Sequence, residues 1–344
     1  MEHGNQSKVN EFILLGLSQA REAQLFLFFL FLLFYSLILP GNILIIVTIR
    51  TDPRLGSPMY FFLANLAFLD ICYCSVTPPK MLTDFFYDRN TISYKGCMAQ
   101  LFFLHWLGGS EVFLLLGMAI DRYVAICHPL HYTSVVSRPA CSVMVILFWC
   151  LGFVHSIIQV VLIVPLPFCG PNEVDNFFCD ITQIVKLACT DTYDLEFFMF
   201  INSGLSALIS FTLLIISYVI LLIKVRTGST EGKSKAASTC ITHIIIVVVM
   251  FGPAIFMYCR PFQESPLDKL VAIFHSTVFP LMNPMIYTMR NKEIKHAMRK
   301  LASHLSFARV HLQVNCDENE FPHGGENKGH VCSNYKAQCQ KDLP

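Results

Sequence analysis

The chain has 344 residues, of which 54% are hydrophobic and only 14% are charged, with a net charge of +1. Soluble domains carry about 25% charged residues. This composition therefore excludes an ordinary soluble domain and favours a protein that crosses the membrane several times. The near-neutral charge, without a long basic run, gives no indication of a nucleic-acid partner. The sequence contains no phosphate-binding loop, nucleophile elbow or zinc-protease motif, and we expect no catalytic residue, no enzymatic activity and no metal site.

Residues 1–24 are polar and lack the pattern of a signal peptide, so we expect an extracellular N-terminus followed by an uncleaved anchor. The chain from 25 to 290 is predicted to be an all-α, seven-transmembrane helix bundle. The predicted spans are residues 25–49, 58–84, 97–122, 140–164, 196–223, 238–259 and 268–289.

Lysine and arginine are more frequent at one end of these spans, which is assigned to the cytoplasm together with the C-terminus. Asn5 begins an N-x-S triplet and is a predicted glycosylation site on the outer side. Residues 291–304 combine basic and apolar positions and are predicted to form an amphipathic helix on the inner membrane surface. Residues 305–344 are polar and aperiodic, which predicts a disordered cytoplasmic tail.

The third predicted span carries a chemically distinct group at each end. It begins with Cys97 and ends with Asp121-Arg122-Tyr123. A helix of this length measures roughly 37 Å at about 1.5 Å per residue. The hydrocarbon core is only ~30 Å thick, so Cys97 and the charged pair are expected at opposite membrane faces.

Four of the 14 cysteines lie on or next to the predicted outer face, which is the oxidising side. They are Cys97, Cys169, Cys179 and Cys189. Four cysteines allow three pairings, and the residues alone do not choose among them. A crosslink from Cys97 to the 165–195 loop would hold that loop over the mouth of the bundle.

Asp70 and Glu111 are the only carboxylates deep within the predicted spans. Charged groups at this depth are costly and usually face the bundle interior. The pair is expected either to share a proton or to hold a Na⁺ with Asn42 and Asn283, or to be a protonated structural pair. The sequence leaves these interpretations open.

Small and polar residues in the outer half of the third span predict a cavity. His105, Gly108, Gly109 and Val112 recur at helical spacing and share one face. The adjacent glycines fit either a close helix crossing or space for a small ligand. A zinc site between His105 and His155 lacks metal-ligand spacing.

The fourth and fifth spans carry further polar residues in their outer halves. His155 and Gln159 are one turn apart, and Asn202, Ser203 and Ser206 follow on the next span. A few polar groups in otherwise apolar helices are typical of a ligand cavity that opens outward.

Several strings indicate a family. They are PMYFFLANL at 58–66, MAIDRYVAICHPLHY at 118–132, KAASTCITH at 235–243 and PLMNP at 280–284. Together with the seven spans, Asp70, Cys97 and Asp121-Arg122-Tyr123, these strings resemble olfactory receptors, a group of rhodopsin-like G-protein-coupled receptors. The resemblance covers roughly residues 10–305.

The resemblance implies roles for individual residues. It implies disulfides Cys97–Cys179 and Cys169–Cys189. It also implies that Asp121 holds Arg122 at rest and that activation releases this arginine to the G protein. The other residues implied in activation and coupling are Tyr123, Tyr218, Asn283, Pro284 and Tyr287.

The function implied by the resemblance is that of an odorant receptor of the plasma membrane. A small, largely apolar volatile would bind in the outer half of the bundle, with Phe251 and Tyr258 added to the polar residues above. A stimulatory G protein would couple at the inner face and raise cAMP. Leu104 and Thr277 replace the residues that amine receptors and opsins use for their ligands, so neither class fits.

Two alternatives remain at this point. One is a receptor of the same family that senses a non-volatile metabolite or lipid outside the nose. The other is an ion- or proton-coupled transporter that uses Asp70 and Glu111, although the lack of internal repeats argues against it.

Overall fold

The computed structural model describes residues 9–87, 89–227, 233–260 and 267–303. Within these ranges, the side chains of 133, 227, 233–236, 238, 239, 242, 283 and 287–290 are not described. The chain divides into two compact units, Met1–Asn291 and Lys292–Pro344. In the second unit, residues 292–303 are helical, as predicted, and the predicted tail lies outside the described residues.

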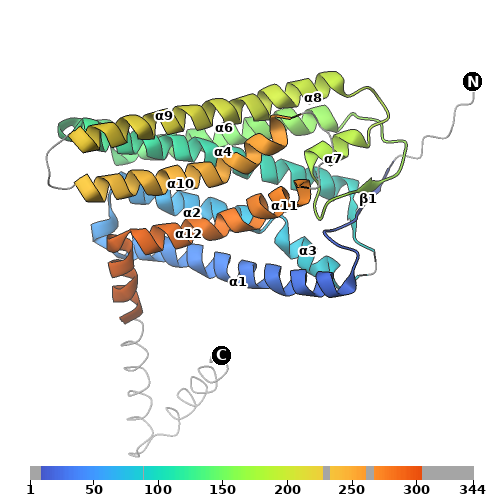
Figure 1. Ribbon diagram of the computed structural model, residues 1–344, viewed down its shortest axis with the longest axis horizontal. Coiled ribbons are helices and arrows are strands. Elements are labelled where there is room, and N and C mark those ends of the chain that lie inside the picture. The colour runs from blue at the N-terminus through green and yellow to red at the C-terminus, as the bar shows by residue number, and fades with distance from the viewer. Residues whose placement is uncertain (1–8, 88, 228–232, 261–266, 304–344) are drawn as a thin grey trace, which may run out of the picture. The chain divides into compact units, whose positions relative to one another are not determined.

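The first unit is built from long helices (Figure 1). Within the described residues, five helical segments are long and apolar enough to cross a membrane: Arg21–Thr51, Pro58–Asp84, Tyr94–Cys127, Arg138–Ile163 and Tyr193–Arg226. The sixth predicted span corresponds to α10 (Lys233–Tyr258), whose apolar part is His243–Tyr258. The seventh is a continuous helical run from Asp268 to Arg290. All seven predicted spans are therefore helical, with ends that differ by a few residues.

Three of these spans contain more than one element. The second consists of α2 (Pro58–Cys74) and α3 (Pro78–Asp84). The fifth consists of α8 (Tyr193–Met199), the π-helical η3 (Phe200–Leu205) and α9 (Ser206–Thr227). The seventh consists of α11 (Asp268–Ile273), the π-helical η4 (Phe274–Val278) and α12 (Phe279–Arg290).

Three other spans are single long helices: α1 (Arg21–Thr51), α4 (Tyr94–Cys127) and α6 (Arg138–Ile163). The remaining helices are short connections. The short ones are η1 (Pro53–Leu55), η2 (Pro129–His131), α5 (Tyr132–Val135) and α7 (Ile181–Lys186).

Local sequence signals set where the long helices begin. The Ser93 hydroxyl accepts a hydrogen bond from the Gly96 N–H at the start of α4, and Ser137 does the same for Ala140 at the start of α6. Both serines satisfy a backbone donor that has no partner within the helix. Pro58 opens α2, where its missing N–H costs nothing.

Helix α4 lies at the centre of the bundle. It packs against α2, α6 and α9, while α1 packs against α2 and α12. The Asn42 side chain of α1 donates to the Pro280 carbonyl of α12 at 3.4 Å. This bond joins α1 to α12. The central position of α4 explains why its residues recur in both functional regions described below.

A small three-stranded sheet covers one end of the bundle, and the sequence did not predict it. Strand β1 (Glu11–Leu14) pairs antiparallel with β2 (Thr91–Ser93) and parallel with β3 (Glu173–Val174). Phe12 and Leu14 point inward and are buried. We call this end, which also carries the disulfides, the outer end.

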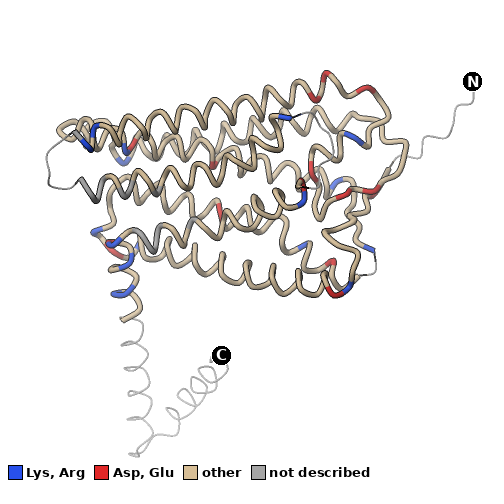
Figure 2. The backbone as a smooth tube through the Cα atoms, in the orientation of Figure 1, with Lys and Arg blue, Asp and Glu red and all other residues tan. Residues whose placement is uncertain are grey.

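The opposite, inner end carries the charged ends of α1, α4, α6 and α9. Its charged side chains are mostly lysine and arginine, whereas both signs mix at the outer end (Figure 2). This distribution matches the predicted orientation.

Candidate functional site

A cavity of about 170 Å³ lies in the outer half of the bundle. Its walls come from α2, α4, α6, η3, α9, α10, α11 and η4, and residues 178–181 of the long outer loop cover it. The structure places all but two of the predicted ligand-binding residues around this cavity: His105, Gly108, Gly109, Val112, His155, Ser203, Ser206, Phe251 and Tyr258. Their role in ligand binding remains a prediction.

Gln159 and Asn202 are the two predicted residues that do not line the cavity. Gln159 is buried and its amide donates to the Ser203 hydroxyl at 2.5 Å and approaches His155 Nε2 at 3.0 Å. Gln159 therefore contacts and orients two side chains that line the cavity, His155 and Ser203. Asn202 lies in η3, whose wider π-helical turn changes which residues face inward.

A hydrogen-bonded pair marks the polar part of the cavity. His105 Nδ1 lies 2.8 Å from the Leu101 carbonyl, which can only accept, so Nδ1 carries the proton. In the neutral ring, Nε2 is then an acceptor, and the Tyr258 hydroxyl donates to it at 3.0 Å. The Tyr258 oxygen keeps a lone pair, so this pair offers a ligand an acceptor.

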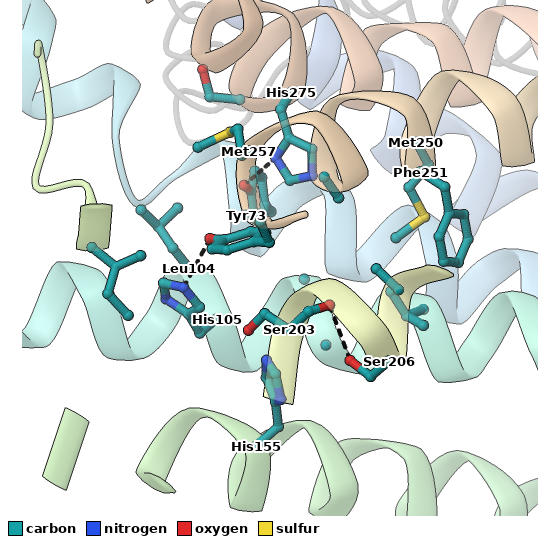
Figure 3. Close-up of a pocket in the computed structure, with 18 of the residues that line it drawn as sticks. Tyr73, Leu104, His105, His155, Ser203, Ser206, Met250, Phe251, Met257 and His275 are labelled. Carbon is teal, nitrogen blue, oxygen red and sulfur yellow. Dashed lines mark hydrogen bonds between the residues drawn. The ribbon is translucent and has the colours of Figure 1, made fainter. Parts of the chain in front are cut away.

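A second pair was missed by the sequence analysis. The Tyr73 hydroxyl of α2 lies 2.8 Å from His275 Nδ1 of η4, and both residues line the cavity (Figure 3). His275 carries the same signal as His105, a lone histidine in an apolar span. Tyr73 carries no such signal, because only the packing of α2 against η4 turns it inward.

The other part of the cavity is apolar. Val112, Met250 and Phe251 line it, and Phe251 is fully buried. Figure 3 shows Met250 and Phe251 on the side away from His105. The site therefore combines a polar end with an apolar end, as is usual for small-molecule sites.

The sequence left open whether Gly108 and Gly109 of α4 allow a close helix crossing or leave space for a ligand. A Cβ on Gly109 would lie 3.3 Å from the Gly152 Cα of α6, and a Cβ on Gly152 would lie 2.6 Å from the Trp106 carbonyl. These values indicate a close crossing of α4 and α6. Gly108 faces Tyr73 at an ordinary 3.7 Å. The glycines thus permit the crossing and also border the cavity.

Two disulfides fix the outer loop. Cys97 bonds to Cys179 and Cys169 to Cys189, which confirms both implied pairings. The Cys179 N–H also donates to Gln100 Oε1 of α4 at 2.9 Å. The predicted crosslink between α4 and the loop is therefore present, and it holds the loop over the cavity.

Asp180, which directly follows this crosslink, also lines the cavity and was missed by the sequence analysis. Its carboxylate accepts from the Thr182 N–H at 3.3 Å and from the Thr182 hydroxyl at 2.9 Å, which caps α7. Burial raises the pKa of Asp180 above its usual value, and the Thr182 hydrogen bonds oppose this shift.

Asp70 and Glu111 are both buried, at 1% and 4% exposure, as expected for carboxylates inside the bundle. Both interact with other groups. Within the described part of the chain, no cluster of three metal-ligating side chains occurs. The Asn283 side chain lies outside the described residues, so the predicted Na⁺ or proton site stays a prediction.

The inner end of α4 carries the charged pair. Arg122 Nε lies 3.4 Å from Asp121 Oδ2, and Asp121 is buried at 1% exposure. The Tyr132 hydroxyl of α5 donates to Asp121 Oδ1 at 2.7 Å, a contact that the sequence analysis did not assign. Asp121 thus has two partners, one of them a neutral hydroxyl.

The other residues implied in coupling are partly described. Tyr218 is buried, with its ring centroid 5.6 Å from that of His243 in α10. Lys224 Nζ lies 5.6 Å from the ring centroid of Tyr123. Pro284 lies inside α12.

Three predicted residues fall outside what the structure describes. The side chains of Asn283 and Tyr287 are not described, and Asn5, the predicted glycosylation site, lies in the undescribed N-terminal stretch.

Comparison with known proteins places these features in a family. A family profile described as olfactory receptor matches residues 31–304. Human olfactory receptor 4M1 is 59% identical over 305 residues, which cover 88% of this chain and 97% of that protein. Mouse olfactory receptor 4M1 is 59% identical over 90% of this chain and 99% of its own length, and human olfactory receptor 4N5 is 56% identical over 89% and 100%. The chain is therefore a multi-pass membrane protein that belongs to the olfactory receptor family.

Proposed function

We propose that this chain is an odorant receptor of the plasma membrane that binds a small, largely apolar volatile in the cavity. Binding would activate a stimulatory G protein at the inner end and raise cAMP. The observation that carries the proposal is the amphipathic cavity between α4, α6, η3 and α10, closed by the disulfide-held loop.

The size of the cavity supports a small ligand. An apolar cavity of about 150 Å³ is large enough to hold benzene, and this cavity measures about 170 Å³. A ligand with few heavy atoms gains at most ~1.5 kcal/mol per atom, which limits its affinity. Shape and dispersion at the Met250–Phe251 end would supply most of the binding free energy.

The hydrogen bonds favour a ligand that carries a donor. Because Tyr258 donates to His105, a ligand hydroxyl would donate to the Tyr258 oxygen and extend the chain to the Leu101 carbonyl. An ether of the same shape cannot make this bond. We therefore expect small alcohols or phenols to act better than their methyl ethers.

The contacts at the inner end support coupling. A resting state in which Asp121 and Tyr132 hold the end of α4 would be replaced by one in which Arg122 contacts the G protein. A ligand shifts this equilibrium only by its differential affinity for the two states.

The test is a cAMP assay in cells that express the full chain, with surface staining, against paired alcohols and methyl ethers. We expect a dose-dependent response to at least one alcohol and none in Arg122→Ala. For that alcohol, Tyr258→Phe should raise the EC50 about tenfold, which is the loss of one hydrogen bond of about 1.4 kcal/mol. Tyr193→Phe, at an exposed tyrosine outside the cavity, is the matched control.

Two results would contradict the proposal. A response that persists in Arg122→Ala would mean that the signal does not pass through this face. A receptor that reaches the surface and responds to no volatile, but does respond to a non-volatile metabolite or lipid, would assign it to the alternative sensing role.

A further inference from the structure

A second hollow lies on the surface of the bundle at its inner end. It is a groove of about 710 Å³ between the last turn of α1, η1, α2 and the first turn of α6. Its wall is mainly apolar, and Phe61 and Phe68 of α2 expose 36% and 49% of their surface there. None of the predicted ligand or coupling residues whose side chains the structure describes lines this groove, which is separate from the cavity.

Two arginines from different helices border the groove. Arg50 lies in the last turn of α1 and Arg138 is the first residue of α6, and both are exposed. Arg138 Nη2 reaches the Gly56 carbonyl at 3.5 Å, which directs it toward the loop between α1 and α2. The groove thus has positive charge at two points beside an apolar wall.

The acidic group of the groove is already engaged. Of the lining residues that the structure describes, Asp52 is the only carboxylate, and Arg54 Nη2 lies 2.6 Å from its Oδ2. Among the described residues, no carboxylate lies within ion-pair distance of the guanidinium of Arg50 or Arg138. The described lining therefore has a net positive charge, which favours the binding of an anion.

We propose that this groove binds one anionic phospholipid of the cytoplasmic leaflet. Its phosphate would lie between Arg50 and Arg138, because guanidinium groups bind phosphate oxygens through paired hydrogen bonds. One acyl chain would lie along Ile46, Phe61 and Phe68. The cytoplasmic leaflet supplies anionic lipids at this end of the bundle.

The apolar wall distinguishes a lipid from a free phosphate. A soluble phosphate would contact the arginines but leave the aromatic wall of α2 uncovered, whereas an acyl chain covers it. A bound lipid would also connect α1 to α6 across α2. The proposal does not depend on the odorant cavity, so either can fail without the other.

The experiment uses the purified full-length receptor in nanodiscs that contain equal amounts of phosphatidylserine and phosphatidylcholine. Native mass spectrometry of the receptor, released with mild detergent, measures the ratio of the two retained lipids. We expect wild type to retain phosphatidylserine in preference. Arg50→Gln/Arg138→Gln should lower this preference about thirtyfold, because each of the two arginines contributes about 1 kcal/mol at the membrane surface.

Two further variants make the test specific. Lys295→Gln/Arg299→Gln removes the same charge from exposed residues of the predicted inner-surface helix, outside the groove, and it should lower the preference far less than the groove variant does. Ala64→Trp fills the groove wall but keeps both arginines, and it should lose retained phosphatidylserine. An excess of glycerophosphoserine, the headgroup without acyl chains, should not displace the lipid.

The outcomes decide the proposal in either direction. Equal losses in the two double variants would assign the preference to general surface charge and overturn the site. A wild type without preference, or displacement by the free headgroup, would overturn it as well. If the Arg50/Arg138 double variant is not recovered folded, Arg50→Gln alone and Ala64→Trp give the same decision.

Discussion

The two ends of the bundle are held together in different ways. At the outer end, one disulfide joins the long loop to α4 and a second closes the loop on itself. A three-stranded sheet also joins β3 of the loop to β1 and, through it, to β2. At the inner end, the predicted coupling residues Asp121 and Arg122 are held by an ion pair at 3.4 Å and by the Tyr132 hydroxyl. The first arrangement suits a preformed cavity, because covalent and backbone contacts limit local opening. The second suits a switch, because few interactions need to break.

Buried polar atoms sharpen this difference. At the outer end, the Cys179 N–H and the Asp180 carboxylate both have partners. At the inner end, Asp121 Oδ2 and Arg122 Nε are buried without a well-aligned hydrogen bond, although they lie within ion-pair distance. A buried polar group without a hydrogen bond costs about 1–3 kcal/mol. The inner end thus holds its charged pair in an arrangement that another partner can improve.

The largest expected effect is loss of the disulfide between α4 and the loop. Its closed segment spans 82 residues, against 20 for the disulfide within the loop. The chain-entropy relation gives about 4.5 and about 3.3 kcal/mol for the two. We expect Cys97→Ser/Cys179→Ser to lower surface expression and melting temperature more than Cys169→Ser/Cys189→Ser does. Equal losses would mean that the loop is held chiefly by its other contacts.

At the inner end, Tyr132→Phe should weaken the resting contact of α4. It removes the hydroxyl that donates to Asp121 Oδ1 at 2.7 Å and leaves a buried carboxylate with one partner fewer. Hydrogen bonds to charged groups contribute about 1.5–3 kcal/mol. We expect higher basal cAMP per receptor at the surface, whereas Tyr87→Phe, at an exposed tyrosine of the outer end, should leave it unchanged. Lower basal signalling in Tyr132→Phe would place this bond in the active state instead.

Asp180 gives a smaller, pH-dependent effect at the outer end. Burial raises the pKa of its carboxyl above the ordinary value, so the folded chain holds this proton more tightly than the unfolded chain. Its contribution to stability is present below the ordinary pKa and is lost as pH rises through the raised pKa. Between about pH 4 and about pH 7, the melting temperature of wild type should fall more than that of Asp180→Asn, which keeps the helix cap. Parallel curves would contradict this assignment.

The sequence predicted the helices well because their signal is strong and local. An apolar run long enough to cross a bilayer has few other structures available, and the seven predicted spans lie within the observed helices or end near them. Cys97 and the Asp121–Arg122 pair were placed correctly at opposite ends from helix length alone. Features that depend on one helix at a time could therefore be predicted.

Features that depend on several segments could not be predicted in this way. The sheet joins strands of two to four residues that lie far apart in the sequence, and no single strand carries a clear pattern. Tyr73 faces the cavity only because of how α2 packs, and Asp180 only because a disulfide places the loop. In the π-helical η3, Ser203 lines the cavity and Asn202 does not, a difference that ordinary helical periodicity does not predict.

The smallest expected effect concerns the ion pair between the loop and α11. Lys269 Nζ lies 2.6 Å from Asp175 Oδ1, but the two side chains are 30% and 51% exposed. Ion pairs at such surfaces contribute about 0–1 kcal/mol and weaken with salt. We expect Lys269→Gln to lower the melting temperature by no more than about 2 °C. Raising the salt concentration should reduce this difference in melting temperature between the variant and wild type. A drop as large as that from Cys169→Ser/Cys189→Ser would mean that charge, rather than covalent and backbone contacts, holds the outer end closed. The contrast between the two ends would then no longer hold.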